Sequence, residues 1–391
     1  MSSEWLSEAF QVERLRERWA ACELHPNSVL DHFLLVSRLA PGVERPLVWI
    51  DNGEDRTCAW AAARLERTHL PLRIGYLPLD HVPVRLLRVI MGGYLGAWDV
   101  ERAGRFVDAC DAILRDDRAD AVEFRCLTEV SPLWTALAHR ARTCGVRAPA
   151  WNRHWELTLD GEPGFLLNRM RSKHRAWIRR KTRELEDAFP QRMQWRWHAP
   201  RDGVRLLCDQ LETVAATTYQ RGLEAGFVNN ALTRARLDLW ARRGELRVLV
   251  LDLDGVPQAF WIGILLHGSF HSSATGYRPE LRAFEVGTLM FLRMVDELIR
   301  EGARKIDFGQ GDAQYKQRFG DHSWREANAL LVAPSWRGRS ACAATALAAA
   351  GERAARRLAE RMGAADRIKQ RWRDRLRRRT DARDAEAQAP V

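Results

Sequence analysis

The stretch Asp307-Phe308-Gly309-Gln310-Gly311-Asp312, followed closely by Tyr315-Lys316, brings together groups that could do acid–base chemistry. The carboxylate of Asp307 or Asp312 could accept a proton, and the Tyr315 phenol could supply one. The Lys316 ammonium, a point charge with three donors, could stabilise an oxyanion or a phosphate. A structural role explains Asp307 almost as well, since an aspartate can cap the glycine turn that follows it.

Three apolar runs precede this stretch and predict strands at residues 246–253, 256–266 and 269–277. Asp254-Gly255 and His267-Gly268 separate them, and Gly accepts the positive φ that a two-residue hairpin turn needs. The sequence therefore predicts an antiparallel meander of three strands.

A helix follows the meander and positions the start of the chemical stretch. It begins at Gly287-Thr288, has apolar residues at helical spacing, and ends at Glu301-Gly302. A short strand at residues 304–308 then leads into the glycines. The helix start is itself a candidate anion site, because free backbone N–H groups and the helix dipole favour negative charge there.

The order of these elements resembles the second half of the GNAT-type N-acyltransferases, in the branch related to CelD polysaccharide-biosynthesis acetyltransferases. That branch ends in a motif close to D-F-G-x-G-x-x-x-Y-K, which is present here from Asp307 to Lys316. The segment Lys316-Gln317-Arg318-Phe319-Gly320 is also similar to the F-K-x-x-F-G of the Fem peptidyltransferases, with Tyr315 in place of the first Phe. Those are double-GNAT enzymes that use aminoacyl-tRNA. The resemblance covers residues 168–320.

The resemblance implies that the donor's pyrophosphate binds at the helix start and that a backbone N–H between residues 273–275 and 307–308 holds the acyl carbonyl. The implied donor-binding residues are Arg282, Gly287, Thr288, Gly309 and Gly311. In the family the loop is written Q/R-x-x-G-x-G/A, and here Glu285 replaces the middle Gly. A carboxylate that faces a phosphate is unfavourable. The alternative for Gly287-Thr288 is a plain helix cap.

The length of 391 residues favours two or three domains, and a hydrophobic content of 46% is enough to give each a sizeable core. No apolar run reaches about eighteen residues, so we expect no membrane-spanning helix. Seven cysteines without a C-x-x-C pair favour reduced thiols and a cytoplasmic location, with a membrane-peripheral position as the alternative. His267 and His271 lie four apart but across a turn, so we expect no metal site.

The net charge of +11 is concentrated at the C-terminal end. Residues 336–391 hold 15 Lys and Arg against 7 Asp and Glu, a net charge of +8, which leaves +3 for the rest. Residues 341–379 predict one amphipathic helix, followed by a disordered end. It could pack on the body of the protein or lie on RNA or an anionic membrane. A DNA-binding module is disfavoured, since its charge would be spread over a fold.

Residues 1–150 show the same order of elements less clearly. We predict a helix within residues 4–40 that includes Trp5 and Trp19 and breaks at His25-Pro26-Asn27. A strand at 47–50 and a strand or helix at 57–65 follow. Residues 100–114, 121–126 and 131–144 then predict a helix, a strand and a helix. This half is read as a degenerate GNAT-like unit with a structural or acceptor-side role.

The region between the halves contributes candidate binding residues. Residues 168–185 predict a basic helix, and Lys173 and Arg180 are its candidate contacts to an anionic donor or acceptor, a solvated surface being the alternative. Helices at 205–219 and 232–243 would cover the acceptor side. By resemblance, Arg221 and Phe227 line the acceptor mouth. His271, on its strand, could face either the cleft or the core.

The predicted fold is mixed α/β (α+β), with tandem GNAT-like units, each a mixed, largely antiparallel sheet flanked by helices, plus a C-terminal basic helix. The predicted domains are 1–150, 151–335 (catalytic) and 336–391. The leading hypothesis is acyl transfer from acyl-CoA, such as acetyl-CoA, to an amine or hydroxyl of a sugar, amino sugar or small metabolite. The first alternative is an aminoacyl-tRNA-dependent transferase, with tRNA or an anionic membrane meeting residues 169–183 and 336–379. The second is a catalytically silent scaffold that binds an anionic polymer.

Overall fold

The computed structural model describes residues 2–52, 58–74, 77–144, 151–218, 221, 226–311, 313–338, 340 and 343. Within them the chain divides into two compact units, and the boundaries fall between His154 and Trp155 and between Ser323 and Trp324. The first unit thus contains the N-terminal part of the chain and the segment from Trp324 onward. The second contains the residues in between. The predicted C-terminal helix at 341–379 lies outside the described residues, apart from residue 343.

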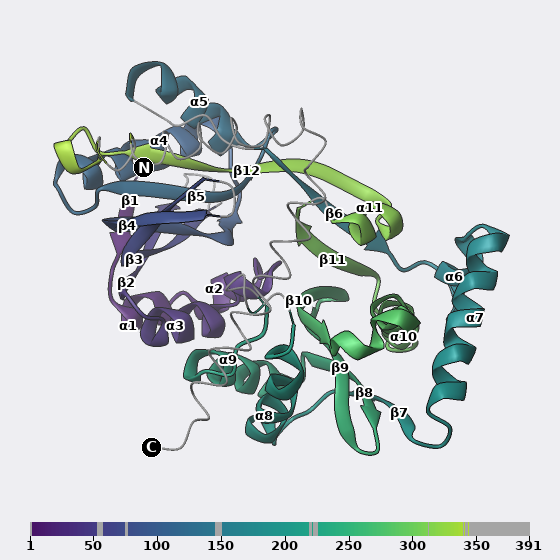
Figure 1. Cartoon of the computed structure of the whole chain (residues 1–391). Helices are drawn as coiled ribbons and strands as arrows, with labels where there is room; N and C mark the ends of the chain where they lie inside the picture. Colours follow the sequence, from purple (N-terminus) through teal and green to yellow (C-terminus); the bar gives the residue numbers. More distant parts are fainter. Residues whose placement is uncertain are drawn as a thin grey trace, which may run out of the picture. The chain divides into compact units, whose positions relative to one another are not determined.

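The first unit is a mixed sheet with helices on both faces (Figure 1). Its strand order is β1-β2-β3-β4-β5-β12, with only β4 and β5 paired in parallel. The strands are β1 (Ser2–Leu6), β2 (Val43–Asn52), β3 (Cys58–Ile74), β4 (Leu77–Gly96), β5 (Ala121–Thr128) and β12 (His322–Val332). The helices are α1 (Ala9–Glu13), α2 (Arg16–Ala20), η1 (Pro26–Ser28), α3 (Leu30–Leu39), α4 (Val100–Arg115) and α5 (Pro132–Cys144).

Both faces of this sheet are apolar because each is covered by helices. Phe106 of α4 and Leu133 of α5 pack with Trp49 and Phe124 on one face. On the other face, residues of α1, α2 and α3 pack on β2, β3 and β4. Three antiparallel strands, a helix and a parallel strand follow one another from β2 to β5, as expected for a GNAT-like unit.

The N-terminal prediction was wrong at Trp5. This residue lies in β1, opposite Trp49 of β2, and not in a helix. Only the later positions, such as Val12 and Trp19, lie in helices, and these are two short ones. The spacing of Trp5 from the next apolar residues fits both the period of a helix and that of a strand. The pairing of residues 2–6 with β2 makes this segment a strand.

The second unit repeats the arrangement with the strand order β6-β11-β10-β9-β8-β7. Its strands are β6 (Asn152–Thr158), which starts in the first unit, β7 (Met193–His198), β8 (Leu246–Leu253), β9 (Val256–Leu266), β10 (Ser269–Tyr277) and β11 (Lys305–Gln310). Its helices are α6 (Phe165–Arg169), α7 (Ser172–Ala188), α8 (Val204–Ala215), α9 (Ala231–Arg242), η3 (Pro279–Phe284), α10 (Val286–Arg300) and α11 (Gln314–Phe319).

The predicted meander is confirmed, since β8, β9 and β10 pair antiparallel in succession. Both hairpin turns have positive φ at their two central residues: 52° and 76° at Asp254-Gly255, and 48° and 79° at His267-Gly268. Turns of this kind match the twist of the flanking strands and need residues that accept positive φ. The glycine in each turn was therefore a usable signal in the sequence.

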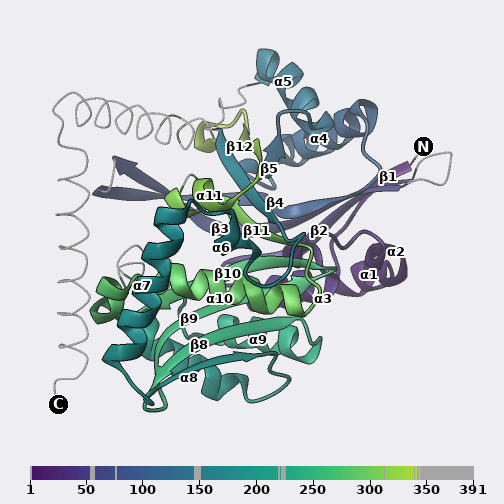
Figure 2. The ribbon, with the colours of Figure 1, turned by 90° about the vertical axis from the view of Figure 1, so that its right-hand side faces the viewer.

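The two faces of the second sheet are covered by different helices. Figures 1 and 2 both show α7 and α10 on one face and α8 and α9 on the other. We call these the α10 face and the α9 face. Trp261 of β9 and Phe308 of β11 belong to the core of the α10 face, with Phe291 of α10. On the α9 face, Phe260 of β9 packs edge-to-face with Phe227 at a centroid distance of 5.8 Å. The fold class is therefore as predicted, for the part of the chain that the structure describes.

Candidate active site

The candidate site of the second unit lies where two parallel strands part. β10 and β11 pair at three consecutive positions only, Ser269 with Lys305, Phe270 with Ile306 and His271 with Asp307. β10 continues to Tyr277 on its partner β9, with an irregularity between Ser272 and Ala274. Backbone groups of β10 beyond His271, on the side toward β11, are thus not used in this pairing and can meet a ligand.

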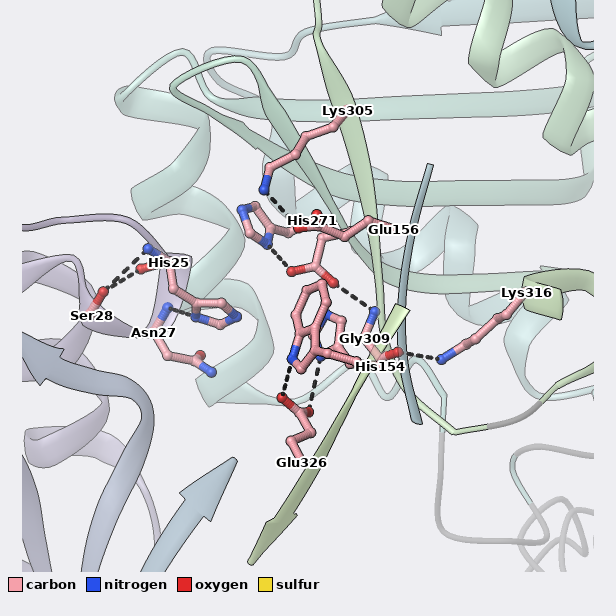
Figure 3. Close-up of polar contacts among 12 residues, drawn as sticks. His25, Asn27, Ser28, His154, Glu156, His271, Lys305, Gly309, Lys316 and Glu326 are labelled. Carbon is pink, nitrogen blue, oxygen red and sulfur yellow. Dashed lines mark hydrogen bonds and ion pairs between the residues drawn. The ribbon is translucent and has the colours of Figure 1, made fainter. Parts of the chain in front are cut away.

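His271 and Asp307 face each other at the last of these positions. The imidazole Nδ1 lies 3.3 Å from Oδ2 of Asp307, and the two side chains are only 12% and 11% exposed. The other carboxylate oxygen accepts a hydrogen bond of 2.7 Å from the Gly309 amide (Figure 3). Asp307 therefore caps the glycine turn, and its second oxygen lies beside the imidazole. Its role as a proton acceptor stays a prediction.

Cross-strand neighbours show on which face the pair lies. His271 is directly opposite Ile264 of β9, and directly opposite residues of an antiparallel pair share a face. Phe308 belongs to the core of the α10 face, and Asp307, its neighbour in the strand, points the other way. The His271–Asp307 pair therefore lies on the α9 face.

The glycine turn after β11 is held by Lys316. Gly309 and Gly311 have φ of +68° and +103°, which disfavour any residue with a Cβ. The buried Lys316 ammonium donates to the carbonyl of Gly309 at 3.2 Å (Figure 3) and to that of Gln310 at 2.6 Å. Lys316 thus fixes the turn that follows Asp307. Asp312, the other candidate base, lies outside the described residues.

Tyr315 lies on the opposite face from the histidine pair. Its ring packs edge-on against Phe308 and Trp261, at centroid distances of 5.8 and 6.5 Å. Both partners belong to the α10 face, and the Tyr315 side chain remains 38% exposed. The His271–Asp307 pair and the Tyr315 phenol thus lie on opposite faces of the parting strands.

The start of α10 has no side-chain cap. Glu285 precedes it in a left-handed conformation, with φ of 57°, and its side chain is exposed. The predicted contact Arg282 is also exposed, in the turn η3, while the Thr288 amide bonds to the Glu285 carbonyl at 2.8 Å. Gly287 lies against Tyr277, because a Cβ there would come within 3.2 Å of its ring. An uncapped start of a 15-residue helix suits an anion, although Glu285 adds a negative charge beside it.

The corresponding helix start in the first unit is different. Asp99 caps α4 by accepting a hydrogen bond of 2.7 Å from the Arg102 amide. Trp98 beside it packs on Trp49 and Phe106. An acidic cap satisfies the amide and repels a phosphate, so this helix start suits an anion less well than that of α10.

The predicted acceptor and docking residues are dispersed. Arg221 forms an ion pair with Glu212 of α8. Phe227 is buried on the α9 face. Lys173 and Arg180 are exposed on α7, across the sheet from His271, and Arg180 lies 3.4 Å from Glu184. Phe227 and, through its ion pair with α8, Arg221 thus belong to the side of the sheet that carries the histidine pair.

Sequence reasoning missed a cavity of about 30 Å³ on the α9 face. Its lining combines apolar side chains with Arg236 and two hydroxyl residues: Phe227, Thr233, Arg236, Leu237, Trp240, Ile262, Ile264 and Ser273. Burial lowers the pKa of the Arg236 guanidinium. The spacing of Thr233, Arg236, Leu237 and Trp240 places them on one face of α9, and this was the available signal.

Comparison with known proteins agrees with this geometry. The family described as "Acetyltransferase (GNAT) domain" matches residues 172–317. The crystal structure of FemX matches with a TM-score of 0.53 at 10% identity, and the likeness covers 85% of this chain and 97% of that one. The fold is therefore that of the GNAT acyltransferases. None of the curated proteins matches the chain.

Two further solved structures are similar at lower scores. One is a tandem GNAT protein from the clavulanic acid biosynthesis pathway, with a TM-score of 0.49, 13% identity, and coverage of 85% of this chain and 99% of that one. The other is the C-terminal domain of a putative lysylphosphatidylglycerol synthetase from Agrobacterium fabrum. Its TM-score is 0.48 at 13% identity, and it covers 86% of this chain and 94% of that one.

Among the described residues, no helix is both long enough and apolar enough to cross a membrane.

Proposed function

We propose that the second unit transfers an acyl group from a thioester donor of the acyl-CoA type to an amine or hydroxyl acceptor. The observation that carries the proposal is the parting of β10 and β11 directly after the His271–Asp307 pair. Parted parallel strands offer unpaired backbone groups to the donor, and a histidine oriented by a carboxylate is a suitable proton acceptor.

The proposed reaction uses both faces of the sheet. The acceptor nitrogen or oxygen forms a bond to the acyl carbon, and its proton passes to His271. A backbone N–H of β10 beyond His271 stabilises the oxyanion that develops on the carbonyl. The carbon–sulfur bond then breaks, and Tyr315 on the α10 face supplies a proton to the departing thiolate. Asp307 orients the imidazole and stabilises its positive charge.

The start of α10 is the proposed site for the donor's pyrophosphate. Its first amides lack a side-chain cap, and Arg282 lies exposed in the preceding turn. Gly287 and Thr288 contribute backbone, as in the family that this segment resembles. Acetyl-CoA is the simplest such donor, and a sugar, amino sugar or small metabolite remains the proposed acceptor, as in the CelD-like branch.

The test is release of free thiol from acetyl-CoA in the presence of a panel of amino sugars and small amines. We expect acceptor-dependent thiol release that is lost in His271→Gln. If the protein binds acetyl-CoA but transfers its acyl group to none of these acceptors, the proposed donor class is supported and the proposed acceptor class is wrong. Absence of both binding and turnover would contradict the use of acyl-CoA.

A second candidate is transfer from aminoacyl-tRNA, supported by the exposed cations of α7. Lys173, Arg179, Arg180 and Arg183 are all exposed on this helix, and α7 adjoins the turn before α10 through the Lys181 hydrogen bond to the Ala283 carbonyl, 2.8 Å long. The likeness to FemX and the Glu285 carboxylate also favour a donor other than CoA. Titration with bulk aminoacyl-tRNA tests this candidate, and Lys173→Glu with Arg180→Glu should weaken binding and reduce its dependence on salt.

A further inference from the structure

Two arginines of the first unit share one face of its sheet. Ala62 of β3 belongs to the core that α1, α2 and α3 cover, and Arg64 and Glu66 follow it at two-residue spacing. Arg88 of β4 is directly opposite Arg64 and therefore points to the same face. The Glu66 carboxylate lies 3.3 Å from Nε of Arg64 and 2.5 Å from a terminal nitrogen of Arg88. One carboxylate thus serves two guanidinium groups.

Arg125 of β5 brings a third guanidinium to this face. Its neighbour Phe124 belongs to the core of the opposite face, so Glu123 and Arg125 point the same way as Arg88. Glu123 lies 2.7 Å from Nε of Arg88, but Arg125 takes no part in these ion pairs. Within the described part of the chain, Nε of Arg125 is buried and has no hydrogen-bond partner. We call the following residues the arginine cluster: Arg64, Glu66, Arg88, Glu123 and Arg125.

The arginine cluster has an excess of one positive charge, because its three guanidinium groups meet two carboxylates. Burial lowers the pKa of Arg64, and the nearby charges of Arg88 and Arg125 add to this effect while Glu66 opposes it. The three guanidinium groups are thus close enough to repel one another. A buried charged donor without an acceptor costs free energy. An anion that accepts from Arg125 would remove that cost and balance the excess charge.

The arginine cluster lies where β4 and β5 part. These strands pair in parallel at four positions, the last being Val89 with Phe124, and Arg125 is the next residue of β5. Beyond this point β4 continues along β3 and β5 along β12. The side chains of Arg88 and Glu123 are 26% and 23% exposed, so the cluster can be reached from solvent. Parting parallel strands thus carry charged groups in this unit, as β10 and β11 do in the second.

We propose that the arginine cluster binds a singly charged oxyanion of a small ligand, a carboxylate or a phosphodiester group, with Arg125 as the main contact. Nε–H and a terminal N–H of a guanidinium form a planar fork that matches two oxygens of such a group. One negative charge balances the cluster, whereas a second would be repelled by Glu66 and Glu123. The first unit is then a binding unit in its own right, whichever donor the second unit uses.

Saturation-transfer NMR on the full chain tests the proposal, because it detects weak binding of acetate and dimethyl phosphate through their methyl protons. The two probes should compete for one site at constant ionic strength, and the tighter one distinguishes a carboxylate from a phosphodiester ligand. Methyl phosphate is doubly charged at a pH of about 8, since its second pKa is about 6, and should bind less tightly than dimethyl phosphate. Absence of binding by both singly charged probes would overturn the proposal, and tighter binding of methyl phosphate would contradict the single charge.

Variants assign the anion to the arginine cluster. Arg125→Met should weaken binding by about tenfold or more, and Arg125→Lys should retain part of it, because the charge remains while the fork is lost. Glu123→Gln should tighten binding by about twofold or more, the size of one partly exposed charge pair. Arg67→Met is the matched control, since Arg67 is on the same strand as Arg64 but is 78% exposed and paired with Glu44.

Unchanged anion binding in a folded Arg125→Met would assign the anion to another site and contradict the proposal. If Arg125→Met fails to fold, Glu123→Gln decides in its place, because it keeps all three guanidinium groups and the size of the side chain. Binding that is equal in Glu123→Gln and wild type would then place the anion away from the cluster and overturn the proposal.

Discussion

His271 Nδ1 lies 3.3 Å from Asp307 Oδ2, at the last position where β10 and β11 pair. Because Asp307 Oδ1 also accepts the Gly309 amide, the carboxylate is fixed at both oxygens. The imidazole is held on the α9 face, where the small cavity lined by Ile264 also lies. One carboxylate thereby links the glycine turn of β11 to the proposed proton acceptor.

Asp307→Asn removes the charge while its remaining oxygen can still accept the Gly309 amide. We expect turnover to fall roughly a hundredfold, because the imidazole that accepts the proton loses the carboxylate that orients it and stabilises its positive charge, while donor affinity and the urea midpoint stay nearly unchanged. Steady-state kinetics and donor calorimetry check this. Asp296→Asn is the matched control, because Asp296 likewise accepts a glycine amide, that of Gly164 at 2.6 Å, away from the pair. Normal turnover in Asp307→Asn would make Asp307 a turn residue only.

Tyr315→Phe removes one hydroxyl and keeps the ring that packs on Phe308 and Trp261. If the phenol protonates the leaving thiolate, turnover with acetyl-CoA should fall by about tenfold or more. With an aryl thioester, whose thiolate needs no proton to leave, the loss should be much smaller. An equal loss with both donors would indicate a role in positioning and not in proton transfer.

Glu285→Gln tests whether the start of α10 binds the donor's phosphates. The change removes the negative charge next to the first helical amides and keeps the size of the side chain. Charge–dipole terms of this kind are worth about 0.3–1 kcal/mol, so donor affinity should rise roughly two- to fivefold. Glu280→Gln, on the same turn and exposed, serves as the control. Weaker donor binding in Glu285→Gln would mean that the carboxylate has its own contact with the donor.

Asp120→Asn tests the electrostatics of the first unit. Burial would raise the pKa of Asp120, but hydrogen bonds from Arg85 outweigh it and leave the pKa below its usual value. A lowered folded-state pKa gives stability that is present above the unfolded-state pKa of about 3.9 and is lost as the pH falls through the folded value. The difference in urea midpoint between wild type and Asp120→Asn should therefore be full at pH 7 and shrink below about pH 4. A difference that does not change with pH would contradict this assignment, and the exposed Asp116→Asn is the control.

The second unit could be predicted largely from local signals. Asp254-Gly255 and His267-Gly268 mark hairpins that fix three strands, and the predicted bounds of those strands agree with the structure. The strand β7 of this unit and the strand β12 of the first unit were missed because each mixes apolar and charged residues. β7 reads Met-Gln-Trp-Arg-Trp-His with little burial, and β12 carries charged residues in its first half. Their strand character depends on pairing with β8 and β5, which a local pattern does not contain.

The candidate site could be predicted only in part. The motif from Asp307 to Lys316 was found, but the contact of Asp307 with His271 depends on a parallel register between strands separated by a whole helix. The cavity is assembled from β9, β10, α9 and the segment around Phe227, so the shared helix face of its α9 residues was not enough to predict it from the sequence. The charge of Lys316 suggested a contact with an oxyanion or a phosphate, which stays a prediction. In the structure its ammonium donates hydrogen bonds to the carbonyls of Gly309 and Gln310 and so holds the glycine turn.

The proposed function requires the acyl donor to bind between β10 and β11 and at the start of α10. Hydrogen–deuterium exchange of the full chain, with and without saturating acetyl-CoA, tests it most directly, and bulk aminoacyl-tRNA provides the parallel arm. We expect slower exchange in peptides that cover residues 272–277 and 286–288 with one of the two donors, and no change in β8, which lies two strands away. Binding of either donor without protection of these peptides, or with protection only in the first unit, would contradict a donor site at this place.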